Sequence, residues 1–123
     1  MKTVNRLTLQ PGTMVAIPTF GQELIARIEQ LEYDKFRVSL SETDPEIGFD
    51  VDTRGFNRVP EGIGEEVAML PLTEFDLITT AELGTRSVWS IDEIRPGRYQ
   101  FVLGKKYEPN IVVNIDGASA DSY

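Results

Sequence analysis

Short segments in which apolar and polar residues alternate recur along the chain, and they constrain the fold more than any other feature. Phe36, Val38 and Leu40 alternate with polar residues, and the segments around Phe49 and Phe101 repeat this two-residue period. Successive side chains of a β-strand point to opposite faces, so the period is typical of strands with one buried face. Further candidate strands lie at 7–9, 15–17, 67–72, 87–90 and 111–115.

Two Pro-Gly pairs, Pro11-Gly12 and Pro96-Gly97, each lead directly into an alternating segment. Proline presets φ and glycine supplies the positive φ of a type II turn, so both pairs predict turns. Short strands every 10–15 residues predict a mainly β domain, a small antiparallel barrel or sandwich with at most one or two short helices. Residues 11–40 are similar in architecture to the strand-hairpin-strand run of SH3-like barrels, without a family motif.

Two segments are compatible with either a helix or strands. In residues 22–33 the apolar side chains follow helical spacing, but alternate residues of the same segment also fit a hairpin that turns at 33–35, which we favour. The apolar residues at helical spacing are Leu24, Ile25, Ile28 and Leu31. Residues 73–83 are a second possible helix, opened by Thr73 and followed by Gly84, although the Thr79-Thr80 pair argues against it.

Composition restricts the chemistry of the chain. Its 123 residues include no histidine and no cysteine, which excludes a Ser-His-Asp triad, a cysteine nucleophile, a zinc finger and a disulfide framework. We expect no catalytic residues, no metal and no cofactor. The length fits one domain, so we expect a β-rich domain at 1–115 and a flexible tail at 116–123, where the residues are small and polar.

Charge and hydropathy indicate the type of partner. Twenty acidic against twelve basic side chains leave a net charge of −8, so we expect no general binding to nucleic acid or anionic membranes, which are polyanions. No apolar run approaches the roughly 20 residues that span a bilayer, and the N-terminus lacks the apolar stretch of a signal peptide. We therefore expect a cytoplasmic protein whose partner is another protein.

A stripe of carboxylates occupies even-numbered positions between 42 and 52. Asp50 and Asp52 lie on one face of a predicted strand, roughly 7 Å apart. Clustered carboxylates suit Ca²⁺ or Mg²⁺, but the spacing lacks the EF-hand pattern. We therefore interpret the stripe as a solvated strand face that discourages edge-to-edge pairing.

The loop at 52–64 is long and carries Arg54, Phe56 and Arg58. The two arginines would clamp a phosphate or carboxylate, with Phe56 as a stacking surface. The alternative, which we favour, places Phe56 in the core and pairs the arginines with nearby carboxylates.

Basic residues gather near the C-terminus, where Trp89, Tyr99 and Tyr107 are also found. The basic residues are Arg86, Arg95, Arg98, Lys105 and Lys106. Such a patch would hold an anion or contact the acidic stripe of another copy. Lys105-Lys106 after Gly104 is also the usual composition of a solvated hairpin turn. We expect Trp89 in the core, with a partner-facing anchor as the alternative.

These observations favour a non-enzymatic interaction or assembly module, such as a phage or bacterial accessory protein that self-associates or docks on a larger protein. In the self-association version, Arg98, Lys105 and Lys106 contact Asp50 and Asp52 of another copy. One alternative is an acidic inhibitor that blocks a basic nucleic-acid-binding groove. Another is a small anion- or nucleotide-binding protein that uses the two arginines of the 52–64 loop.

Overall fold

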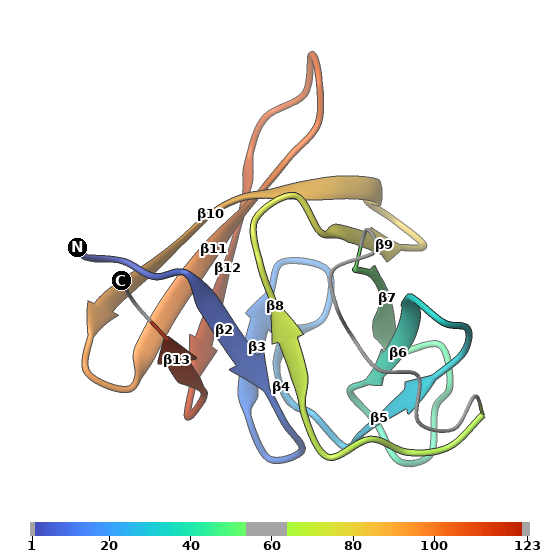
Figure 1. Ribbon diagram of the computed structural model, residues 1–123. Coiled ribbons are helices and arrows are strands. Elements are labelled where there is room, and N and C mark those ends of the chain that lie inside the picture. The colour runs from blue at the N-terminus through green and yellow to red at the C-terminus, as the bar shows by residue number, and fades with distance from the viewer. Residues whose placement is uncertain (1, 54–63, 122–123) are drawn as a thin grey trace.

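The computed structural model describes residues 2–53 and 64–121, and within these ranges the chain forms thirteen strands and no helix (Figure 1). This confirms a mainly β fold with the curvature of a small barrel. A specific SH3-like topology is not confirmed. No helix in the described ranges is long and apolar enough to cross a membrane.

Ten strands form one large antiparallel sheet. They are β1 (Lys2–Thr3), β3 (Met14–Ile17), β4 (Gly21–Leu24), β5 (Arg27–Gln30), β6 (Lys35–Ser39), β7 (Gly48–Asp52), β9 (Leu77–Thr80), β10 (Gly84–Arg95), β11 (Arg98–Gly104) and β12 (Ile111–Asp116). The order is β4-β3-β12-β11-β10-β9-β7-β6-β5, with β1 paired to β10 beside this path.

The two end strands of this sheet, β4 and β5, are consecutive in the chain and are joined by Ile25 and Ala26. Ile25 donates its N–H to Thr13 O (2.9 Å) and Ala26 donates to Ser39 O (2.8 Å), so this link holds both ends of the curled sheet.

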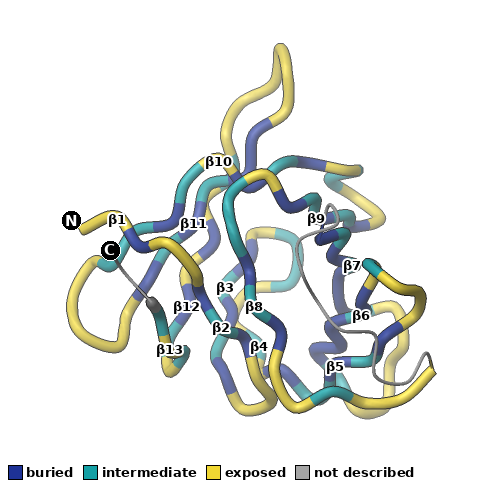
Figure 2. Tube along the Cα trace, in the orientation of Figure 1, coloured by how far each residue is buried: buried dark blue, intermediate teal, exposed yellow. Residues whose placement is uncertain are grey.

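A smaller sheet lies across the curled one (Figure 1). It contains β2 (Arg6–Leu9), β8 (Leu70–Leu72) and β13 (Ser119–Asp121), in the order β13-β2-β8. Leu7, Leu9, Leu70 and Leu72 are fully buried, because alternate residues of β2 and β8 face the large sheet. The core therefore lies between the two sheets, where Figure 2 shows buried segments on most strands.

The strand interpretation of residues 22–33 is confirmed, because β4 and β5 occupy this segment with a bend at Ile25 and Ala26. The possible helix at 73–83 is not formed: Leu77–Thr80 are β9, where Ile78 and Thr80 are buried on alternate positions. The β-branched residues Ile78, Thr79 and Thr80 favour a strand over a helix in this segment.

Both Pro-Gly pairs form the predicted turns. Gly12 has a φ of +92° and Gly97 a φ of +83°, and these are backbone conformations that side chains with a Cβ rarely adopt. The pair at 96–97 joins β10 to β11 in a tight hairpin, with Arg95 opposite Arg98. This hairpin begins the pairing of the two strands that carry the site described below, and their register shifts twice farther along, between Arg95 and Glu93 and between Ser90 and Val88.

The segment at 116–123, expected to be a flexible tail, contains paired backbone as far as it is described. Asp116 ends β12, Gly117 donates to Gly97 O (3.1 Å), and β13 pairs with β2 through Ala120 opposite Leu7. Pairing partners distant in sequence thus extend strand structure into a stretch without sequence periodicity. The division into one domain and a tail stays a prediction.

Strand β10 positions the site described below. One edge pairs with β11, and the other pairs with β9 near Gly84 and with β1 near Glu93. Between β9 and β1, the chain from the β8–β9 connection covers this second edge. Phe75 N–H donates to Val88 O (2.8 Å), and Val88 N–H donates to Asp76 O (2.9 Å).

Candidate functional site

Trp89 is the extra residue of a β-bulge in β10. Val88 lies opposite Leu103 and Ser90 lies opposite Val102, which leaves Trp89 without a partner on β11. A bulge re-aims side chains, and bulges are frequent beside functional sites. Val88 faces the core, whereas Trp89 is 47% exposed, so the expectation that Trp89 belongs to the core is wrong.

The indole of Trp89 lies directly against the backbone of Gly104. A Cβ atom at Gly104 would overlap Cδ2, Cε2 and Cζ2 of the ring. The φ of Gly104 lies outside the left-handed region, so the backbone conformation does not require a glycine here. The close approach of the aromatic ring does. This packing fixes the exposed tryptophan in one place.

The connection between β11 and β12 projects from the body of the protein (Figure 1). All six residues at 105–110 are exposed, as Figure 2 shows for the projecting loop. Tyr107 is 92% exposed and has a φ of +69°, and Lys106 Nζ lies 5.0 Å from the centre of its ring. The loop thus presents a cation and an aromatic ring in a defined arrangement.

Arg86 anchors this loop to the sheet. The residue is only 7% exposed, and its guanidinium donates to Leu83 O (3.3 Å), Pro109 O (3.1 Å) and Glu108 Oε2 (2.8 Å). The planar guanidinium suits three acceptors at fixed directions. Arg86, a member of the basic cluster in the sequence, therefore holds the projecting loop rather than a partner.

A third exposed aromatic residue, Phe75, lies at the same end of the molecule. Its N–H bonds to Val88 O, the residue before Trp89, and its side chain is 67% exposed. Phe75 and Tyr107 are the two non-glycine residues with a positive φ in the described part of the chain. Such backbone strain occurs often at functional sites. We call Phe75, Trp89, Lys105, Lys106 and Tyr107 the aromatic-cationic end.

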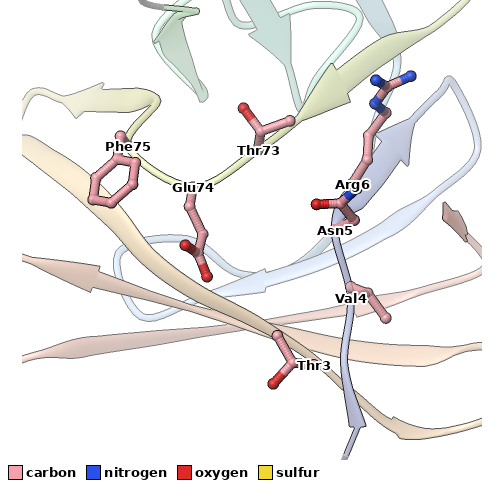
Figure 3. A pocket seen from close by; sticks show the side chains of 7 residues that line it. All are labelled: Thr3, Val4, Asn5, Arg6, Thr73, Glu74 and Phe75. Carbon is pink, nitrogen blue, oxygen red and sulfur yellow. The ribbon is translucent and has the colours of Figure 1, made fainter. Parts of the chain in front are cut away.

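A cavity of about 450 Å³ adjoins this end beside Phe75 (Figure 3). One wall comes from the N-terminal segment and the other from the β8–β9 connection. The lining residues are Thr3, Val4, Asn5, Arg6, Thr73, Glu74 and Phe75. Thr73 Oγ1 is buried without a hydrogen-bond partner among residues 2–53 and 64–121. The cavity therefore lies between the two segments that cover this edge of β10.

Of the predicted acidic stripe, Asp50 and Asp52 lie on β7 as expected, whereas its members at 42–46 lie in the connection before this strand, and the charge of Asp50 is compensated within the chain. Asp50 Oδ1 lies 3.3 Å from Arg37 Nη1, and Asp52 lies opposite Lys35 in the β6–β7 register. In the part of the chain that the structure describes, no three His, Cys, Asp or Glu side chains are grouped to hold a metal. Asp50 is therefore a poor acceptor for the cations of another copy.

The basic cluster of the sequence is divided in space. Arg98 begins β11 and Lys105 follows its end, roughly 20 Å away at the rise of an extended strand. Arg98 Nε donates to Asp116 Oδ1 (2.8 Å), and this hydrogen bond raises the pKa of Arg98. Tyr99 is buried, which raises the pKa of its phenol, with a further rise from the Glu93 carboxylate. Of the exposed cations of the cluster, Arg98 is paired with Asp116, whereas Arg95, Lys105 and Lys106 have no carboxylate within 4 Å among the described residues.

Three predicted binding residues, Arg54, Phe56 and Arg58, lie outside the described residues.

A comparison of the chain with known protein families, curated proteins and solved structures gives no match. No sequence signal predicts the exposed position of Phe75 beside β10. The contact at Gly104 was also missed, although a glycine within a strand pattern is itself a signal of close approach.

We expect Gly104→Ala to displace the Trp89 ring at a cost of about 1 kcal/mol in the free energy of unfolding, because the half-exposed ring can swing away. Acrylamide quenching of the fluorescence of Trp89, the chain's one tryptophan, measures the displacement and should increase. In a Trp89→Ala background, Gly104→Ala should cost almost nothing. An equal cost in both backgrounds, measured by urea denaturation, would contradict the contact.

Proposed function

We propose that this protein is a non-enzymatic interaction module that docks on an acidic protein surface through its aromatic-cationic end. One observation carries the proposal: three exposed aromatic side chains and two lysines lie on adjoining segments of an acidic chain, because Phe75 bonds to the residue before Trp89 and Trp89 packs on the glycine that precedes the projecting loop. Exposed tryptophan and tyrosine are the residues that most often dominate binding energy at protein interfaces.

The charges of this end favour an acidic partner. Lys105 and Lys106 have no carboxylate within 4 Å among the described residues, whereas Arg37, Arg86 and Arg98 each have one. Unpaired cations on a chain of net charge −8 favour an oppositely charged partner, and they steer its approach and orientation. The partner surface therefore offers carboxylates around an apolar contact.

The contacts that hold the aromatic-cationic end in place support specific docking rather than nonspecific association. Trp89 is fixed against Gly104, and Arg86 fixes the projecting loop. Side chains that are already ordered lose little conformational freedom on binding, so more of the contact energy becomes affinity. A small cytoplasmic accessory protein of a phage or bacterium that needs no cofactor is consistent with this role.

We expect peptides selected from a random display library on the purified protein to be rich in Asp and Glu. Lys105→Glu/Lys106→Glu should weaken their binding about tenfold or more, because each reversal replaces attraction by repulsion. Trp89 fluorescence reports the occupied site directly.

The matched control is Lys2→Glu/Arg95→Glu, which reverses two exposed charges at the far end of the β1–β10 pair. It produces the same change in net charge and should leave peptide affinity within about twofold. Selected peptides without acidic enrichment, or equal weakening by both double variants, would overturn the proposal.

A further inference from the structure

An acidic groove lies at the β9–β10 turn and shares no lining residue with the aromatic-cationic end. Its volume is about 530 Å³, within the range of binding sites. The β3–β4 turn, the β6–β7 connection and the β9–β10 turn form its walls. The lining residues are Thr19, Phe20, Arg37, Asp44, Pro45, Glu46, Ile47, Gly48, Ala81 and Glu82.

The floor of the groove is apolar and its rim is acidic. Phe20 and Ile47 are half-buried and pack against the core, whereas Asp44, Glu46 and Glu82 are exposed. These three carboxylates form the rim.

The single cation of the groove is already engaged by its own chain. Arg37 donates to Pro45 O (2.7 Å) and pairs with Asp50. The Arg37 guanidinium also packs closely against Gly48, where a Cβ atom would approach both Val38 O and this guanidinium. The rim carboxylates therefore keep an unbalanced negative charge.

We infer that this groove receives the projecting loop at 105–110 of a second copy of the chain. The loop supplies what the groove lacks: Lys105 and Lys106 match the rim carboxylates, and the ring of Tyr107 matches the apolar floor. This inference rests on the proposed docking role of the aromatic-cationic end and names its partner.

The positions of loop and groove favour a closed, symmetric dimer. Both flank the β9–β10 turn: Glu82 lines the groove, while Leu83 O is bound by Arg86 and the Lys105 ammonium lies beside Gly84. Because the two surfaces are neighbours, two copies related by a two-fold axis can exchange loops reciprocally. Each contact is then made twice, which doubles the loop-in-groove area.

The test is a charge exchange between loop and groove. The loop variant is Lys105→Glu/Lys106→Glu, the groove variant is Glu46→Lys/Glu82→Lys, and the fourth protein combines all four changes. We expect light scattering to give twice the chain mass of 13.8 kDa for the wild type, one chain mass for each double variant, and recovery of the dimer in the combined variant. Lys2→Glu/Arg95→Glu should remain dimeric.

The outcomes separate this inference from the proposed function. A wild type that stays monomeric, while acidic peptides still protect Trp89 from quenching, overturns the dimer and keeps the docking role. Dimers that persist in either double variant overturn the loop-in-groove contact. A monomer that also fails to bind acidic peptides overturns both. Circular dichroism of each variant confirms that a lost dimer is not a lost fold.

Discussion

We expect Glu108→Ala to lower the free energy of unfolding by about 2–3 kcal/mol, although Glu108 is half exposed and lies in a projecting loop. The reason is its partner. Arg86 is buried, and removing the carboxylate at 2.8 Å leaves a buried guanidinium with only two carbonyl oxygens. Breaking a buried pair from one side costs roughly 3–5 kcal/mol, and the exposure of Glu108 reduces this.

Arg86→Met should be less destabilising than Glu108→Ala, because it removes the buried charge together with its pairing, and Glu108 is then solvated by water. The same substitution should release the loop, so that amide hydrogen exchange at 105–110 becomes faster while the strands keep their protection. Docking through Lys105 and Lys106 should weaken with it.

The Arg98–Asp116 pair is the matched control for this prediction. Its shortest N···O distance is also 2.8 Å, but both side chains are about 40% exposed. Exposed ion pairs contribute little to stability, so Asp116→Ala should lower the free energy of unfolding, measured by urea denaturation, much less than Glu108→Ala does. A loss at Asp116 as large as that at Glu108 would show that burial of Arg86 does not determine the effect.

The strands were predictable from the sequence because their signal is local. Phe36, Val38 and Leu40 alternate within a few residues, and so do the residues around Phe49 and Phe101. The order of the strands was not predictable, since β3 pairs with β12 almost 100 residues later and β2 lies between β8 and β13. Such pairings depend on packing between distant segments, which alternation does not specify.

The composition of the site was visible in the sequence, but its geometry was not. The sequence predicts one cluster of five basic and three aromatic residues near the C-terminus, but the structure divides it, with Arg98 at the start of β11 and Lys105 after its end. The bulge that turns Trp89 outward depends on its register with β11, which has no local signal. The pairing of Arg86 with Glu108, 22 residues away, likewise removes Arg86 from the exposed charges.

The acidic stripe shows the same limitation. Asp50 and Asp52 share a face because they lie two residues apart, which the sequence determines. The salt bridge between Asp50 and Arg37 depends on the β6–β7 register, which also places Lys35 opposite Asp52. The proposed acceptor for the lysines is therefore not Asp50 and Asp52 but the groove around Glu46 and Glu82, whose walls come from three separate segments.

We expect Asp76→Ala to lower the free energy of unfolding by about 3 kcal/mol and to disorder the turn that presents Phe75. Asp76 is fully buried, and its Oδ2 accepts the N–H of Thr73 (3.0 Å). Truncation removes this bond and leaves a donor without a partner inside the turn, which costs roughly 1–3 kcal/mol, and the empty volume adds to that cost. The turn also bonds to both backbone groups of Val88, so its loss exposes the edge of β10 beside Trp89.

Two variants of the same turn separate this cause from a general effect of mutation. Asp76→Asn keeps an oxygen that can accept from Thr73 and should retain part of the lost stability. Glu74→Ala changes a carboxylate two residues away and should stay within about 0.5 kcal/mol of the wild type in urea denaturation. If Asp76→Ala proves as mild as Glu74→Ala, the buried carboxylate does not hold the turn. Other contacts of the loop would then hold Phe75 at its positive φ. The arrangement of the aromatic-cationic end would depend on the contacts of Arg86 and Gly104 alone.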